Sequence, residues 1–115
     1  DRSLLKAITK AIQVSDIGIN PIDDGVSIRL NFPAPTEERR KALAKDVSKM
    51  AEEAKVAVRN VRRDAMDKFK AAKKASELTE DDLKNGENEL QKITDEFVKK
   101  VDEIASAKEK EVMEI

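Results

Sequence analysis

One apolar stripe runs through the middle of this chain and limits what the chain can fold into. Its members recur at alternating spacings of three and four positions, the period of one face of an α-helix. They are Leu43, Val47, Met50, Ala54, Ala57, Val61, Ala65, Phe69 and Ala72. The stripe predicts one helix from Glu37 to about Ala75, roughly 60 Å long at 1.5 Å per residue. Thr36 is the expected N-cap, and Glu37 and Glu38 suit the positive end of the helix dipole.

A second stripe of the same kind follows a short connection. It consists of Leu83, Leu90, Ile93, Phe97, Val101, Ile104 and Val112. Thr79, with Asp82 three positions later, approximates a capping box at the start of this helix. Two long amphipathic helices joined by a short loop predict an antiparallel hairpin. Both stripes are wide enough to need a third partner, so we expect a missing helix or self-association of the chain.

The region before the long helix predicts a small α/β piece. Residues 3–14 have the pattern of a short amphipathic helix, and residues 15–25 are rich in turn-forming residues. Apolar and polar residues alternate from Val26 to Phe32, which predicts a half-buried strand that needs a partner strand.

Two prolines separate this piece from the long helix. We expect Phe32, Pro33, Ala34 and Pro35 to form a hinge, because proline disfavours both helix and central strand. The predicted domains are a small α/β domain at 1–32, a hinge at 33–36 and a helical domain at 37–115. The fold class is α+β and predominantly α: a long antiparallel helical hairpin plus a small α/β fragment joined by a proline hinge.

Charge is divided unequally between the two predicted helices. Residues 37–75 carry 13 basic and 7 acidic groups, a balance of +6, and residues 77–115 carry 6 basic and 13 acidic groups, a balance of −7. At about 100° per residue, most basic groups of the first helix fall in one sector. These are Lys41, Lys45, Lys55, Arg59, Arg62, Arg63, Lys70 and Lys73. Such sorting favours a polyanionic partner.

Arg59, Arg62 and Arg63 are the strongest binding candidates, with Lys55 beside them. Their i, i+3, i+4 spacing forms one cluster, which we expect to be exposed and to point away from the apolar stripe. Guanidinium groups bind phosphate bidentately, and structured RNA is recognised largely by shape and backbone. Three other interpretations remain: a solvated face, pairing of the basic helix with the acidic helix, and a helical-hairpin module that binds a protein and no RNA. The pairing would involve some of Lys49, Lys68 and Lys74.

Enzymatic activity is not expected. The chain has no Cys and no His, and no Gly-rich phosphate loop, so we predict no catalytic residues, no metal site and no cofactor. Glu80, Asp81 and Asp82 are interpreted as a helix cap rather than as metal ligands. No apolar run approaches the roughly 18 residues that a membrane span needs, so no membrane partner is expected.

Several segments, in order, resemble one family, the ribosome recycling factor. They are Lys10-Ala11-Ile12, Ser15-Asp16-Ile17-Gly18-Ile19-Asn20-Pro21, Thr36-Glu37-Glu38-Arg39-Arg40-Lys41, Val56-Ala57-Val58-Arg59-Asn60-Val61-Arg62-Arg63-Asp64-Ala65, Thr79-Glu80-Asp81-Asp82 and Gln91-Lys92-Ile93-Thr94-Asp95. The resemblance implies an antiparallel three-helix bundle and a smaller β/α/β domain linked by two hinge strands. It also implies that this chain matches the last three-fifths of such a protein, without the first bundle helix, the first hinge strand and about half of the small domain. The absence of an initial Met before Asp1 likewise predicts a fragment of a longer product.

The functional implications of the resemblance are specific. Members bind the ribosome through large-subunit ribosomal RNA after termination and, with elongation factor G, separate the subunits for reuse. They catalyse no covalent chemistry. Arg59, Arg62 and Arg63 match the arginine cluster that contacts ribosomal RNA, Arg39 and Arg40 match the basic pair after the hinge, and Phe32–Pro35 match the second hinge strand. We expect a cytoplasmic location in bacteria, or an organellar homologue.

Overall fold

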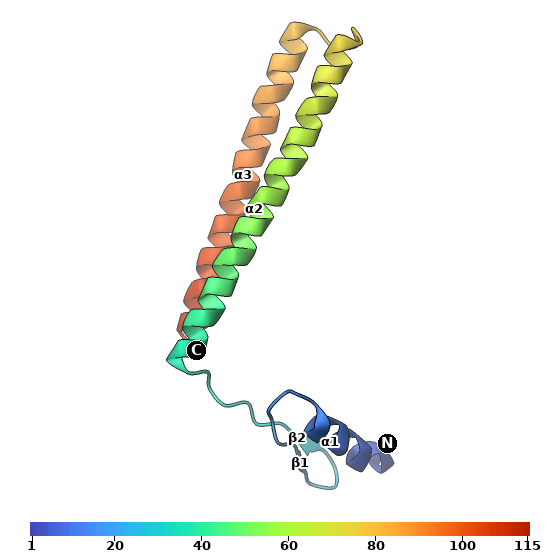
Figure 1. The fold of residues 1–115 in the computed structure, drawn as a ribbon, viewed down its shortest axis with the longest axis vertical. Coiled ribbons are helices and arrows are strands. Elements are labelled where there is room, and N and C mark those ends of the chain that lie inside the picture. The colour runs from blue at the N-terminus through green and yellow to red at the C-terminus, as the bar shows by residue number, and fades with distance from the viewer. The chain divides into compact units, whose positions relative to one another are not determined.

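The computed structural model describes all 115 residues, and they form two compact units (Figure 1). The first unit comprises residues 1–34 and the second comprises residues 35–115. The predicted fold class is confirmed: two long helices pack as a hairpin, and a small helix with a two-stranded sheet lies in the first unit. No helix combines the length and the hydropathy that crossing a membrane requires.

The first unit begins with a short helical segment. A 3-10 turn, η1 (Arg2–Leu4), leads into α1 (Leu5–Val14), and the Asp1 carboxylate accepts a hydrogen bond from the Ser3 amide at 2.8 Å. The sheet consists of β1 (Ile22–Asp23) and β2 (Ile28–Arg29), which pair antiparallel with Ile22 opposite Arg29 and Asp23 opposite Ile28. This pairing supplies the partner strand that the sequence required.

The predicted strand from Val26 to Phe32 is much shorter in the structure. Only Ile28 and Arg29 are in strand, and their partners are Asp23 and Ile22. Within β2 the expected half-buried pattern is present, with Ile28 half-buried and Arg29 exposed. Val26 and Phe32, which lie outside the strand, are 63% and 72% exposed, so the expected burial does not extend to them.

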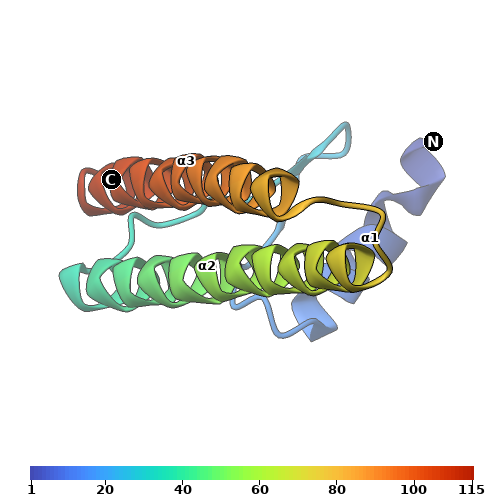
Figure 2. The same cartoon turned by 90° about the horizontal axis from the view of Figure 1, so that it is seen from above.

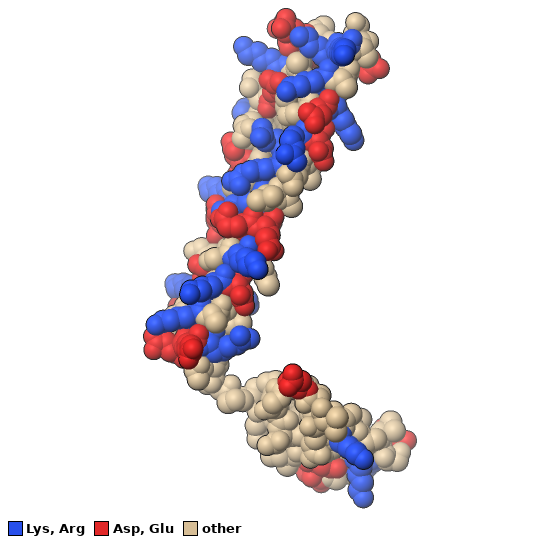
Figure 3. All heavy atoms as spheres, in the orientation of Figure 1, with Lys and Arg blue, Asp and Glu red and all other residues tan.

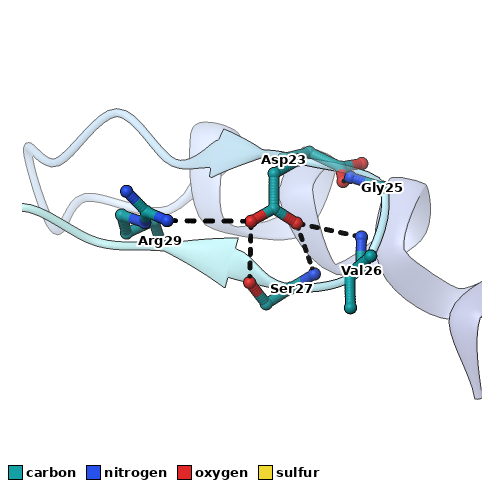
Figure 4. A network of polar contacts seen from close by, with 6 residues as sticks. Asp23, Gly25, Val26, Ser27 and Arg29 are labelled. Carbon is teal, nitrogen blue, oxygen red and sulfur yellow. Dashed lines mark hydrogen bonds and ion pairs between the residues drawn. The ribbon is translucent and has the colours of Figure 1, made fainter.

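A carboxylate closes the turn between the two strands (Figure 4). Asp24 accepts hydrogen bonds from the amides of Val26 and Ser27 at 2.9 and 2.7 Å, and from the Ser27 hydroxyl at 3.0 Å. These bonds, the Ser27 amide foremost, hold the pKa of Asp24 below its ordinary value. Gly25 occupies the left-handed region at φ 82°, as a tight turn of this kind requires.

The second unit is a hairpin of α2 (Glu37–Lys74) and α3 (Glu80–Met113), which lie side by side along their length (Figures 1 and 2). The Thr36 hydroxyl accepts from the Arg39 amide at 3.1 Å, as expected of an N-cap. Thr79 and Asp82 form the predicted capping box, with bonds of 3.1 and 3.0 Å in the two directions. That box lowers the pKa of Asp82, chiefly through the Thr79 amide.

The end of α2 has the hydrogen bonds of a Schellman motif. The Glu77 amide donates to the Ala72 carbonyl and the Ser76 amide to the Lys73 carbonyl, each at 2.9 Å. Ser76 adopts φ 60°, the left-handed conformation that this motif needs and that usually belongs to glycine. The chain thus reverses within residues 75–79 and α3 returns along α2.

The two apolar stripes do not face each other squarely. Met50, Ala54, Ala57 and Val61 of α2 are exposed, as are Ile93, Phe97 and Ile104 of α3. The side of α2 that meets α3 is centred about 60° around the helix from the centre of the predicted stripe, at 100° per residue. Its half-buried members are Arg40, Leu43, Ala44, Val47, Ala51, Lys55, Val58, Arg62, Ala65, Met66, Phe69, Ala72 and Lys73. Five residues of the predicted stripe, Leu43, Val47, Ala65, Phe69 and Ala72, are among them. The stripe is therefore covered on one side only, because it is wide enough for two partner helices and meets one.

The interior of the hairpin is correspondingly small. Only Val112 and Thr94 are buried, at 7% and 6% exposure, and the Thr94 hydroxyl donates to the Leu90 carbonyl at 2.7 Å. Gly86 of α3 has a packing role. A Cβ at this position would lie 3.2 Å from the Phe69 ring, so glycine allows the helices to approach closely there.

Candidate nucleic-acid interface

The basic residues of α2 lie among many acidic ones. Figure 3 shows Lys and Arg interspersed with Asp and Glu over the visible face of the hairpin, rather than one uniform positive surface. The charge that can act on a partner therefore depends on what each cation already contacts. The basic sector divides into cations paired with carboxylates, cations held by neutral amides, and cations with no side-chain partner.

Lys55 is paired with two carboxylates. Its Nζ lies 2.7 Å from Glu52 Oε1 and 2.9 Å from Asp102 Oδ1, and its side chain is only 14% exposed. Those contacts, the hydrogen bond to Glu52 first, raise the pKa of Lys55 above its ordinary value of 10.5. The sequence placed Lys55 among the phosphate-binding residues, and the structure contradicts the exposure that this role assumed. The reason is rotation: the side of α2 that carries Lys55 faces α3.

Two further lysines of the sector are also paired. Lys41 Nζ lies 3.2 Å from Glu37 Oε1, one turn away on the same helix, and Lys73 Nζ lies 3.5 Å from Glu80 Oε1 at the start of α3. The interhelical ion pairs therefore come from Lys55 and Lys73. None comes from Lys49, Lys68 or Lys74, the three lysines that the sequence suggested for this role.

Arg62 also departs from expectation. It is half-buried beside α3, where its Nη1 donates to Gln91 Oε1 at 3.4 Å, so it does not point away from the hairpin contact. Its side chain lines a groove of about 220 Å³ together with Val58, Val61, Leu90, Ile93, Thr94 and Phe97. Unlike Lys55, Arg62 contacts no carboxylate, and its charge remains unneutralised.

Arg59 and Arg63 lie where the sequence placed them, on the exposed side of α2. Arg63 Nη2 donates to Asn60 Oδ1 at 3.0 Å, while the Arg59 guanidinium has no side-chain partner. With Arg62 they form an arginine cluster, Arg59, Arg62 and Arg63, within two turns of helix. Lys45 and Lys70 are likewise exposed and unpaired. An unpaired guanidinium can make charge-assisted, bidentate bonds to a phosphate without first breaking an ion pair.

Arg39 and Arg40, the basic pair at the start of α2, have different surroundings in the structure. Arg39 is exposed, and its guanidinium has no side-chain partner. Arg40 is half-buried, and its Nη1 donates to the carbonyl oxygens of Met113 and Ile115 at 3.3 and 3.0 Å. A cation at the carbonyl end of a helix is stabilised by the helix dipole. Arg40 therefore ties the first turn of α2 to the last turn of α3, which the sequence pattern did not indicate.

Sequence reasoning also missed the residues that hold the arginines. Asn60 and Gln91 were noted only as parts of matching segments, and neither was assigned a role. The Asn60–Arg63 contact was accessible from the sequence, because residues three apart share a helix face. The Gln91–Arg62 contact depends on how the two helices are aligned, which the stripes alone do not determine.

The hairpin also carries a larger apolar groove, separate from the one that Arg62 lines. It has a volume of about 440 Å³ and is lined by Val47, Met50, Ala51, Ala54, Val101, Ile104, Ala105 and Lys108. Val61 and Ile104 are 68% and 70% exposed. We call this surface, with the exposed Ile93 and Phe97, the apolar face. It is suited to packing against another helix rather than to binding RNA phosphates.

Comparison with known proteins identifies close relatives. The family model described as ribosome recycling factor matches residues 1–113. The ribosome-recycling factors of Caldicellulosiruptor bescii and Lactococcus lactis subsp. cremoris are 57% and 56% identical over 112 and 115 residues, or 97% and 100% of this chain. These alignments cover 61% and 62% of the relatives, so the chain spans about three-fifths of their length.

A solved structure is similar as well. It is described as the T. thermophilus ribosome recycling factor and the E. coli elongation factor G bound to the E. coli post-termination complex. The TM-score is 0.59 at 50% sequence identity, and the match covers 98% of this chain and 61% of that chain.

Proposed function

The chain belongs to the ribosome recycling factor family, and from this premise we propose that it acts in ribosome recycling. It binds the post-termination ribosome through large-subunit ribosomal RNA, and with elongation factor G it promotes separation of the subunits. It performs this task by binding alone, with no covalent chemistry. The corresponding location is the bacterial cytoplasm, or the matrix of an organelle for an organellar homologue.

The observation that carries the RNA proposal is the state of the arginine cluster. Arg59 has no partner, and Arg62 and Arg63 are held only by neutral amide oxygens. Three permanent charges within two helical turns, none cancelled by a carboxylate, favour contact with a phosphate backbone. Arg39 is a fourth contact of the same kind. Lys55 and Arg40 serve the hairpin itself, because both are committed to contacts within it.

We further propose two domains separated by a hinge. Residues 1–32 form part of a small α/β domain, residues 33–36 form the hinge, and residues 37–115 form two helices of a three-helix bundle. Pro33 and Pro35 restrict their own φ and bias the preceding residues toward extended conformations. The boundary between the two compact units, after Ala34, falls within this segment.

The apolar face supports a proposal about assembly. We propose that in this chain a second copy covers it, taking the place of the third helix that the resemblance implies. Light scattering should then give a multiple of the 12.9 kDa chain mass. Ile104→Lys should restore the monomer, while Val56→Lys, an exposed apolar position outside the groove, should not. A 12.9 kDa monomer at high concentration, with no dye binding to apolar surface, would contradict this proposal.

Salt dependence tests the proposed RNA binding. Affinity of the chain for purified large ribosomal subunits should fall linearly on a log–log plot against salt concentration, because phosphate contacts release counterions. The alternative is a helical-hairpin module that binds only protein. Binding that is flat in log salt would support that module and contradict the RNA proposal.

A further inference from the structure

A short polar chain runs from Arg62 into α3. Arg62 Nη1 donates to Gln91 Oε1 at 3.4 Å, and Gln91 Nε2 donates in turn to Asp95 Oδ1 at 2.8 Å. Gln91 and Asp95 are four residues apart on one face of α3. The amide of Gln91 thus lies between a guanidinium on one helix and a carboxylate on the other.

The orientation of that amide is set by its two charged neighbours. Its oxygen faces the cation and its NH₂ group faces the anion, so both contacts are favourable. The reversed amide would point NH₂ at a guanidinium that can only donate, and oxygen at a carboxylate that can only accept. Asp95 therefore keeps the Gln91 oxygen presented to Arg62.

The stem of Arg62 is restrained separately. It lines the groove of about 220 Å³ beside apolar side chains of both helices. Aliphatic stems of arginine pack well on such surfaces while the charged head remains in water. Packing at the stem and one acceptor at the head together limit the positions that the guanidinium can occupy.

Because the acceptor for Arg62 is a neutral amide, it leaves the positive charge of Arg62 uncancelled, which a carboxylate would not. Lys55, one heptad earlier, is held by Glu52 and Asp102, which cancel its charge for any outside partner. Gln91 holds Arg62 in the corresponding place at the helix contact without adding a charge. Arg62 is therefore both restrained and fully cationic, and restraint in advance reduces the entropy cost of binding.

We propose that Gln91, oriented by Asp95, is a positioning residue that holds the Arg62 guanidinium for an RNA phosphate without neutralising it. This inference rests on the proposed function and deepens it. It assigns a role to α3: the helix positions Arg62 for RNA, although its own net negative charge would repel RNA phosphates.

Binding of large ribosomal subunits at fixed salt tests the role in recognition. Gln91→Glu places a carboxylate against Arg62 and should weaken binding about tenfold, since it converts the contact into an ion pair. Gln91→Ala removes only the restraint and should weaken binding by about threefold. Asn88→Asp is the matched control, because it adds the same charge one turn away on α3, at a residue that makes no hydrogen bond to Arg62. It should change binding less than about twofold.

Combination with Arg62→Ala separates this inference from the proposed function. In an Arg62→Ala background, Gln91→Glu should do no more than Asn88→Asp, because the group it acts through is gone. If Arg62→Ala weakens binding but Gln91→Glu matches Asn88→Asp in the wild-type background, the positioning role is wrong and the proposed function stands. If Arg62→Ala itself has no effect, both are overturned.

Mobility of Arg62 in the free chain gives a readout that needs no RNA. The ¹⁵N relaxation of the Arg62 Nε–Hε group should show restricted motion in the wild type and faster, larger motion in Gln91→Ala and Asp95→Ala. Arg59, which has no partner, should be mobile in all of them and serves as the internal reference. Equal mobility of Arg62 and Arg59 in the wild type would overturn the proposed restraint.

Discussion

Lys55 and Arg62 lie two turns apart on the same side of α2, yet their surroundings differ in kind. Lys55 is paired with Glu52 and Asp102, whereas Arg62 contacts only the amide of Gln91. In sequence both belong to the same basic sector. The comparison shows that a cation at a helix contact can stabilise the hairpin or remain available to a partner, depending on whether the facing residue carries a charge.

Removal of Arg62 should have the largest effect on binding. Arg62→Ala should weaken affinity for large ribosomal subunits by about 1–3 kcal/mol, the scale of hydrogen bonds to charged groups. Arg62→Lys should recover only part, because an ammonium cannot reproduce the bidentate fork. Lys108→Ala, whose cation is paired with Glu111 on α3, is the control and should change little. The contrary result is that Arg62→Ala unfolds the chain while the fraction that remains folded binds as tightly as the wild type. Arg62 would then have a structural role, and the contrast with Lys55 would disappear.

Removal of Lys55 should affect folding rather than binding. The pKa of Lys55 is raised above 10.5 in the folded chain, so its stabilisation is complete below that value and is lost as pH rises through the raised pKa. Denaturant unfolding between pH 7 and 12 should show this alkaline loss in the wild type and a shallower one in Lys55→Met. Arg62→Ala should retain the wild-type pH dependence, because it leaves Lys55 and its two carboxylates in place. An alkaline limb identical in wild type and Lys55→Met would show that the ion pairs contribute nothing.

Freeing Lys55 from one of its carboxylates should have the smallest effect on binding. Asp102→Asn removes one of its two carboxylates and should strengthen binding to large ribosomal subunits by roughly twofold, on the scale of an exposed ion pair. Glu103→Gln is the matched control, since it makes the same charge change on the next residue of α3 and contacts Lys99 instead. A gain of equal size in both variants would indicate a general charge effect and not the freeing of Lys55.

Local signals in the sequence predicted the elements of the hairpin well. Thr36 and Thr79 cap their helices as expected, because capping depends on residues three positions apart. The strand prediction was too long, because the alternation from Val26 to Phe32 contains no information about the partner strand, which comprises only Ile22 and Asp23. Pairing, unlike capping, depends on both segments at once.

The site was predicted only in part for a related reason. Helical periodicity gave the angular positions of Arg59, Arg62 and Arg63 around α2, and the first and last of these are exposed as expected. It did not give the direction from which α3 approaches, because the apolar stripe is wider than a single partner covers. That direction places Arg62 beside Gln91 and Lys55 beside Asp102. The contact of Arg40 could not be predicted for the same reason, because its acceptors lie at the C-terminal end of the chain, beside the start of α2.

The salt dependence of binding measured in parallel for wild type, Arg62→Ala and Lys55→Ala tests the central claim most directly. Removing one bond to a phosphate should make the log–log slope for large ribosomal subunits shallower by about one unit or somewhat less. We expect a shallower slope for Arg62→Ala and the wild-type slope for Lys55→Ala, because Arg62 is unneutralised whereas Lys55 is paired with two carboxylates. Equal reductions in the two variants would contradict it, and so would a reduction in Lys55→Ala alone.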